Sequence, residues 1–133
     1  MGASDRAELG LADTTLFIAL EQDRPLMGVP PERIAVSVVT IAELRLGALA
    51  AADGPTRARR LETLTRADNL EPIPVDRAVA VAWASLRLAL RDAGKRMPLN
   101  DSWIAATALA MDVPVVTQDA DYDDVPGLDV VRV

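Results

Sequence analysis

Hydrophobic residues along this chain gather in short apolar runs that alternate with longer segments of helical spacing. Four short runs have the length of strands: residues 9–12, 34–39, 113–117 and 128–133. The last three are rich in β-branched residues, as buried parallel strands are, while the first is weakened by Gly10. The longer segments place apolar side chains at helical intervals over residues 15–21, 40–52, 56–67, 77–93 and 100–111. Because strands and helices alternate, we expect an α/β fold of three α/β/α layers, with a central, mostly parallel sheet.

Capping and turn residues mark where these elements begin and end. Four residues occupy positions typical of helix starts: Asp13, Thr40, Thr56 and Asp76. Gly94 is a typical stop for the helix that follows Asp76, and Ile73, between two prolines, allows only a short edge strand. The helix 77–93 is apolar around most of its circumference. We therefore expect that helix to be deeply buried or to lie at a subunit interface.

The length and composition predict one domain and a protein of the cytoplasm. A chain of 133 residues, half of them hydrophobic, is long enough to build a core, and we expect a single domain over residues 1–133. No apolar run reaches the ~18 residues of a membrane span, and the first residues lack the apolar stretch of a signal peptide. The absence of Cys is compatible with a reducing compartment.

Four acidic residues follow apolar runs or stand at predicted helix starts: Asp13, Glu43, Asp101 and Asp119. In a parallel sheet these positions converge at the carboxyl ends of the strands, where ligands bind. Each pair of like charges 4 Å apart costs about 4 kcal/mol at an effective dielectric constant near 20. Such a cluster needs raised pKa values or a hard divalent cation. The spacing therefore predicts a site for Mg²⁺, with Mn²⁺ as a substitute, and chemistry on phosphate.

The residue types that are absent narrow the chemistry further. Without His and Cys, the usual Ser-His-Asp and Cys-His catalysts and imidazole or thiolate zinc sites are excluded. A net charge of −6 argues against broad electrostatic binding to nucleic acid. Two local basic runs remain, and each is either a solvated helix face or a track for phosphates. They comprise Arg57, Arg59 and Arg60, and Arg91, Lys95 and Arg96.

Four segments of the chain resemble the PIN-domain ribonucleases, and more narrowly the VapC toxins of VapBC toxin–antitoxin pairs. The segments are LADTTLFIAL (11–20), VSVVTIAELRLGA (36–48), PLNDSWIAATALAMDVPVVTQDADY (98–122) and PGLDVV (126–131). The resemblance implies Mg²⁺-dependent cleavage of RNA, a homodimer, and inhibition by a small VapB-like antitoxin in a hetero-oligomer. It also implies that the acids of the site are Asp13, Glu43, Asp101 and Asp119, with Asp121 as the second candidate for the fourth position.

Each acid also has a structural interpretation. Asp13 is placed to cap the first helix, and Thr40-x-x-Glu43 has the spacing of a capping box. Asp119 and Asp121 lie in what is otherwise a solvated acidic loop. Three neighbouring hydroxyl residues either steer water or bond to local backbone: Thr14, Ser102 and Thr117.

The aromatic residues and the single lysine bear on the remaining alternatives. Trp83 and Trp103 are expected in the core, which leaves Tyr122 as the one candidate for stacking on a base. A Mg²⁺-dependent phosphotransfer or phosphatase domain would need a lysine after a late strand, but Lys95 precedes the Asn-Asp motif. An inactive PIN-fold binding module is the non-enzymatic alternative. The sequence favours a toxin endoribonuclease.

Overall fold

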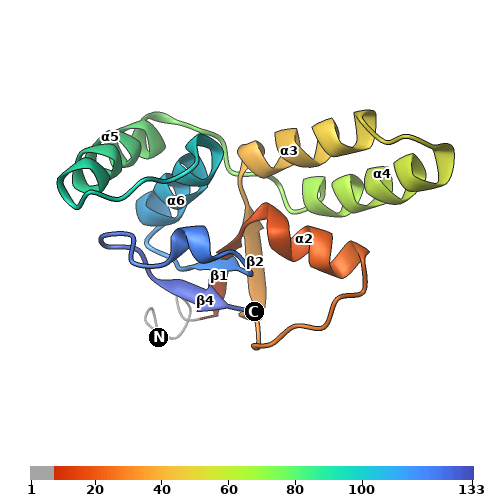
Figure 1. Ribbon diagram of the computed structural model, residues 1–133, viewed down its shortest axis with the longest axis horizontal. Coiled ribbons are helices and arrows are strands. Elements are labelled where there is room, and N and C mark those ends of the chain that lie inside the picture. Colours follow the sequence, from red (N-terminus) through yellow and green to blue (C-terminus); the bar gives the residue numbers. More distant parts are fainter. Residues whose placement is uncertain (1–7) are drawn as a thin grey trace.

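A four-stranded sheet forms the centre of the structure, a computed structural model that describes residues 8–133 (Figure 1). All strand pairs are parallel, in the order β2-β1-β3-β4. The strands are β1 (Leu9–Ala12), β2 (Arg33–Val36), β3 (Val115–Thr117) and β4 (Val130–Arg132). The helices are α2 (Thr14–Glu21), α3 (Val38–Leu49), α4 (Gly54–Asp68), α5 (Arg77–Asp92) and α6 (Leu99–Met111), with a short 3₁₀ helix η1 (Ala120–Tyr122).

Alternate side chains of the central strands enter two separate cores. Leu11 and Val115 belong to a cluster with buried residues of α5 and α6. Their neighbours Ala12 and Val116 belong to a second cluster with α2, α3 and α4. Because successive side chains of a strand point to opposite faces, the sheet lies between two layers of helices. The predicted α/β/α fold is confirmed.

Gly10 is required where β1 passes its neighbours. A Cβ atom at this position would lie 2.4 Å from Cγ2 of Val116 and 3.0 Å from Cγ of Pro31. Glycine has a low preference for strands, and here it lets β1 approach the side chains beside it. The first strand therefore forms as predicted, with Asp13 directly at its end.

The predicted boundary between β2 and α3 is wrong. The β-branched run 34–39 predicts a strand through Val39, but β2 ends at Val36 and α3 begins at Val38. The reason is Ser37, whose Oγ accepts a hydrogen bond of 3.0 Å from the backbone N–H of Val39 and so caps the helix. Thr40 is therefore inside the helix and is not its cap.

Other element boundaries differ locally. Asp53, rather than Thr56, caps α4, because its Oδ1 accepts a hydrogen bond of 2.8 Å from the Thr56 N–H. Asp76 caps α5 as predicted. Ile73 forms an isolated parallel bridge to Ser37 instead of a strand. The last two strands are shorter than their apolar runs, at three residues each.

Of the two alternatives for α5, deep burial is wrong, and a place at a subunit interface stays a prediction. Its buried residues are Val79, Leu86 and Leu90, which lie on one stripe of the helix. On other sides Val81 is 63% exposed and Leu88 is 50% exposed. Within residues 8–133, no helix has the length and apolar character needed to cross a membrane.

Candidate metal centre

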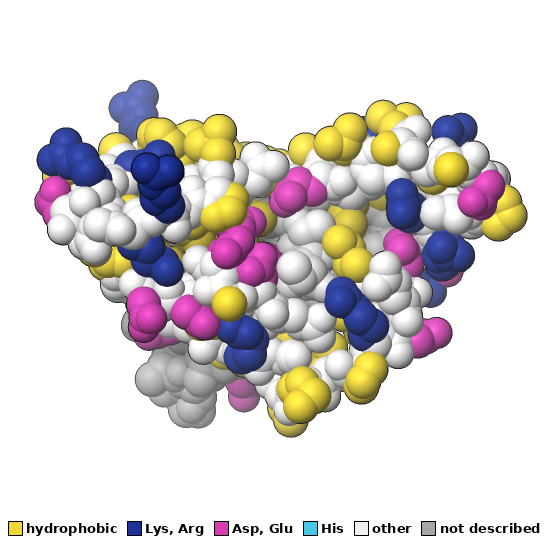
Figure 2. Space-filling model, viewed as in Figure 1, with side chains coloured by type: hydrophobic (Ala, Val, Ile, Leu, Met, Phe, Trp, Pro, Cys, Tyr) yellow, Lys and Arg dark blue, Asp and Glu magenta, His cyan; other side chains and the backbone are white. Residues whose placement is uncertain are grey.

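The carboxyl ends of β1 and β3 deliver polar side chains to one edge of the sheet. Asp13 follows β1, and Thr117 ends β3 two residues before Asp119. Glu43 comes to this edge from α3, and Asp101 comes from the first turn of α6. Acidic side chains gather near the middle of the face in Figure 2, in a hollow between the α5–α6 side and the α3–α4 side.

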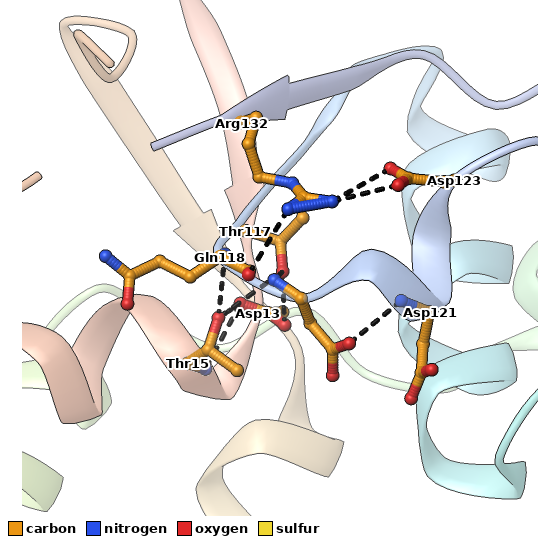
Figure 3. A network of polar contacts seen from close by, with 8 residues as sticks. Asp13, Thr15, Thr117, Gln118, Asp121, Asp123 and Arg132 are labelled. Carbon is orange, nitrogen blue, oxygen red and sulfur yellow. Dashed lines mark hydrogen bonds and ion pairs between the residues drawn. The ribbon is translucent and has the colours of Figure 1, made fainter. Parts of the chain in front are cut away.

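Asp13 is held in place by hydroxyl groups from two elements. Its side chain is almost fully buried, with 2% exposed. Oδ1 accepts hydrogen bonds of 3.1 Å from the Thr15 N–H and 2.6 Å from the Thr15 hydroxyl, while Oδ2 accepts one of 2.8 Å from the Thr117 hydroxyl (Figure 3). Burial raises the pKa of Asp13, and the two hydroxyl bonds oppose that rise. Asp13 thus caps α2 and also lies at the edge of the sheet where the acidic side chains gather, which we call the acidic edge.

Three further carboxylates meet closely enough to share one ion. One oxygen atom from each of Asp101, Asp119 and Asp121 lies within 4.8 Å of the others. Asp119 caps η1, since its Oδ1 accepts a hydrogen bond of 2.8 Å from the Asp121 N–H. This turn brings both candidates for the fourth acid to the same place (Figure 3).

The surroundings of Asp101 disfavour its charged form. Burial raises its pKa to about 7, with further increases from the charges of Asp119, Asp121 and Glu43. A group that holds its proton near neutral pH for these reasons gains most from a cation placed beside it. The helix α6 begins after Pro98 with no side-chain cap, so Asp101 adds a favourable negative charge near its N-terminus.

Tyr122, the one candidate that the sequence offered for stacking on a base, is buried against Asp101 and is not available for stacking. Its side chain is 0% exposed, and its hydroxyl donates a hydrogen bond of 3.3 Å to Oδ1 of Asp101. Burial, together with the charges of Asp13 and Asp101, raises the pKa of Tyr122, so the phenol stays protonated as a donor. The acidic sequence DADYDD (119–124) predicts a loop exposed to solvent. The Tyr122 ring is nevertheless buried, because η1 packs against α6.

Glu43 faces the edge rather than the start of its own helix. The capping box with Thr40 is wrong, because the N-cap of α3 is Ser37, three residues before Thr40. Instead, Oε1 of Glu43 accepts a hydrogen bond of 2.8 Å from the Thr14 hydroxyl of α2. Thr14 and Glu43 line a pocket of about 250 Å³ that continues between α2 and α3 to Arg60.

Of the two parts that the sequence left open for Ser102, the structure favours the bond to local backbone. Ser102 is structural, since its hydroxyl donates a bond of 2.6 Å to the Leu99 carbonyl and accepts one of 3.0 Å from Nε1 of Trp83. Thr15 was missed by sequence reasoning, although it is the second threonine of the Asp-Thr-Thr motif. Its hydroxyl donates a hydrogen bond to Asp13 and accepts one of 3.0 Å from the Gln118 N–H. The second bond connects α2 to the end of β3.

The residues present suit a hard divalent cation. Every donor at the edge is an oxygen atom from a carboxylate or hydroxyl group, the class that Mg²⁺ and Mn²⁺ prefer. Burial first, and the neighbouring carboxylates second, raise the pKa of Asp101, and a counter-charge beside it would oppose both effects. Asp101, Asp119 and Asp121 form the group that geometry brings together, while Asp13 and Glu43 flank it.

Comparison with known proteins places this fold and edge in a family. Residues 11–128 match the PIN domain family. The chain is 45% identical over 128 residues to Ribonuclease VapC5 of Mycobacterium tuberculosis (strain ATCC 25618 / H37Rv), covering 93% of this chain and 95% of that protein. Ribonuclease VapC4 of the same strain is 47% identical over 128 residues, covering 92% and 95%.

A solved structure agrees with the sequence match. VapBC-5 from Mycobacterium tuberculosis, described as a member of the VapBC family of toxin–antitoxin systems, aligns with a TM-score of 0.84 at 43% identity. The alignment covers 95% of this chain and 99% of that chain. The chain therefore belongs to the PIN-domain family, and within it to the VapC group.

Proposed function

We propose that this protein is a Mg²⁺-dependent endoribonuclease that acts in the cytoplasm as the toxin of a toxin–antitoxin pair. The observation that carries the proposal is the meeting of Asp101, Asp119 and Asp121 within 4.8 Å beside the buried Asp13. The names of the relatives VapC5 and VapC4 as ribonucleases support the same activity. Mn²⁺ is expected to replace Mg²⁺.

At this edge of the sheet, the carboxylates would bind the cation and the hydroxyl groups would orient a carboxylate. Asp13, Asp101 and Asp119 would hold the cation, with Asp121 as an alternative to Asp119 and Glu43 as a further ligand or an acceptor for water. A divalent cation there supplies a Lewis acid that lowers the pKa of water and neutralises charge developing on phosphate oxygens. Thr15 and Thr117 fix the orientation of Asp13, so its oxygens need little rearrangement on binding.

The alternative functions receive less support. A phosphotransferase or phosphatase would need a lysine beside the carboxylates, but the single lysine, Lys95, lines a different pocket at the end of α5. An inactive binding module would need no mutually repelling acids. Asp101 instead carries an electrostatic cost, from burial and from its acidic neighbours, that a bound cation would offset.

The activity is tested with purified protein free of antitoxin. RNA cleavage is expected with Mg²⁺ or Mn²⁺ and should stop in EDTA, while the Asp101→Asn variant serves as the matched control for a contaminating nuclease. Equal cleavage in EDTA, or equal cleavage by the variant, would overturn the proposal.

We also propose that a small antitoxin covers this edge and that the toxin is a homodimer. The 250 Å³ pocket between α2 and α3 opens beside Glu43 and offers a partner access to the acids. The exposed Val81 and Leu88 of α5 supply apolar surface for a second copy. Purification from the native host should recover a small stoichiometric protein that suppresses cleavage, and light scattering of the free toxin should give a dimer. A monomer with no such partner would overturn both assignments.

A further inference from the structure

A second pocket, rich in cations, lies where α5 ends. It has a volume of about 340 Å³ and is distinct from the acidic edge. Four of its lining residues are cationic and two are apolar: Arg87, Arg91, Lys95 and Arg96, with Leu90 and Met97. Basic side chains are also prominent over the α5 end of the molecule in Figure 2.

The end of α5 folds the chain back so that these cations meet. Gly94 has a φ of +66°, the left-handed conformation that ends many helices. Its N–H donates to the Arg91 carbonyl at 3.1 Å, and the Lys95 N–H donates to the Leu90 carbonyl at 2.9 Å. This pair of bonds is a Schellman motif. It returns Lys95 and Arg96 to the side of the helix that carries Arg87 and Arg91.

The four cations have almost no anionic partners within the molecule. Among residues 8–133, no carboxylate forms an ion pair with Arg87, Lys95 or Arg96, and Arg91 pairs only with its exposed neighbour Asp92, at 3.4 Å. Arg87 lies 5.6 Å from the ring centroid of Trp83, a cation–π contact that leaves its charge in place.

The other basic run of the sequence is used differently. Arg57 and Arg60 donate to the carbonyls of Leu49 and Gly47, at 3.4 and 2.8 Å, and Arg59 lies 4.0 Å from Glu21. That run therefore stabilises the contact of α4 with α2 and α3. Within residues 8–133, the run at the end of α5 makes fewer contacts, since Arg91 bonds only to Asp92 and no side-chain hydrogen bond or ion pair engages Lys95 or Arg96.

The negative end of the helix dipole does not account for so many cations. A helix C-terminus carries the equivalent of about half a negative charge, which one cation near the last turn balances. Here four converge on one concavity, and their mutual repulsion is a cost that an anion would remove. The pocket thus has the charge and shape of an anion site.

The chain connects this pocket directly to the candidate metal centre. Met97 lines the pocket, and Asp101 follows four residues later in the first turn of α6. Trp83 of α5 bonds to Ser102, the neighbour of Asp101, and stacks on Trp103 with ring centroids 4.4 Å apart. A polyanion seated in the pocket would therefore enter the hollow from the α5–α6 side.

We propose that the pocket of Arg87, Arg91, Lys95 and Arg96 binds backbone phosphates of the RNA substrate and holds the strand beside the acids. The proposal rests on the proposed ribonuclease function and adds where the RNA backbone binds. A local group of cations is needed for this binding because the net charge of −6 repels nucleic acid. Arginine supplies bidentate bonds to phosphate, and contacts to phosphate position a strand without reading its sequence.

Binding is measured without cleavage, on the full chain in EDTA, with a short single-stranded oligouridylate. The two tryptophans of the chain stack on each other beside Arg87, so their fluorescence reports on the pocket. The test variant carries Lys95→Gln and Arg96→Gln. The control carries Arg24→Gln and Arg77→Gln, which removes the same charge from exposed sites elsewhere. Thermal unfolding of both variants checks that they are folded.

The expected result is a loss in both affinity and salt dependence for the test variant. Each lost phosphate contact lowers the slope of log K against log salt by about 0.7 for a single strand, so two lower it by about 1.4. If the test variant and the wild type bind equally well at 1 M salt, this difference in slope makes the variant bind about 25-fold more weakly than the wild type at 0.1 M salt. With Mg²⁺, KM should rise and kcat should stay unchanged, as expected for lost uniform binding.

Three results would overturn the proposal: unchanged affinity in the test variant, equal weakening in the control, or complete competition by millimolar inorganic phosphate. The last would assign the pocket to a small phosphate ligand. Failure of the ribonuclease function gives a different result, namely oligouridylate binding in EDTA that depends on Lys95 and Arg96 with no cleavage in Mg²⁺.

Discussion

Replacing Asp101 by Asn should stabilise the metal-free protein while abolishing its activity. The change keeps the shape of the side chain and removes one charge from a crowded group. In the wild type, burial and the charges of Asp119, Asp121 and Glu43 raise the pKa of Asp101 from 3.8 to about 7. The folded state therefore holds a proton over a pH range in which the unfolded state has released it.

The sign of the effect follows from this raised pKa. When the native state binds more protons than the unfolded state, stability falls as pH rises, here between about pH 4 and pH 7. Taken at face value, the difference between 3.8 and 7 gives about 4 kcal/mol as a ceiling above pH 7. Asp101 is partly exposed, so solvent screening reduces this figure, and we expect a gain of about 1–2 kcal/mol in Asp101→Asn.

Thermal unfolding in EDTA measures this gain. At about pH 8 the variant should melt about 4–8 °C above the wild type. At about pH 4.5 the two should nearly coincide, because Asp101 is then protonated in the folded wild type and costs little. RNA cleavage by the variant should fall at least about 100-fold. The control is Asp129→Asn, an exposed acid before β4, which should leave both measurements unchanged.

Either of two results would refute the reasoning. A variant less stable than the wild type at about pH 8 would mean that Asp101 stabilises the fold through its hydrogen bond with Tyr122. A gain of the same size at both pH values would mean that the gain does not come from removing a charge, and that the repulsion among the carboxylates is small.

Three further perturbations test the surroundings of the site. Tyr122→Phe removes the donor to Asp101, so the acidic limb of the pH–activity profile should move to higher pH with unchanged metal dependence. Glu43→Gln should unfold like the wild type, since no cap is lost, and should need more Mg²⁺ for cleavage; full activity at low Mg²⁺ would restrict Glu43 to holding Thr14. Gly10→Ala should lower the free energy of unfolding by about 1–3 kcal/mol in chemical denaturation, because its Cβ would overlap Val116.

The sequence predicts the fold and the position of the acids because both depend on local patterns. Apolar runs locate the four strands, and a parallel sheet brings the residues that follow them to one edge. Asp13 and Asp119 are therefore placed together by topology alone. The identity of the ligands remains a prediction, although the structure brings Asp101, Asp119 and Asp121 into one group.

The misassigned features depend on tertiary packing. Val38 and Val39 favour a strand by their β-branched side chains, yet Ser37 starts a helix there. Tyr122 stands among aspartates and reads as exposed, but α6 offers it a buried place under Asp101. The same limit applies to the basic runs, since only the fold shows that one of them is occupied by carbonyl groups of α3.

The order of the strands has a consequence for how the protein is made. β1 is among the first elements to leave the ribosome, but β3, its neighbour in the sheet, and Thr117, the partner of Asp13, lie about a hundred residues later. During translation β1 can pair only with β2, and Asp119 and Asp121 are absent until the chain is almost complete. A nascent chain therefore cannot assemble the group of Asp101, Asp119 and Asp121 until its synthesis is nearly finished, so any activity that needs this group begins only with the completed chain.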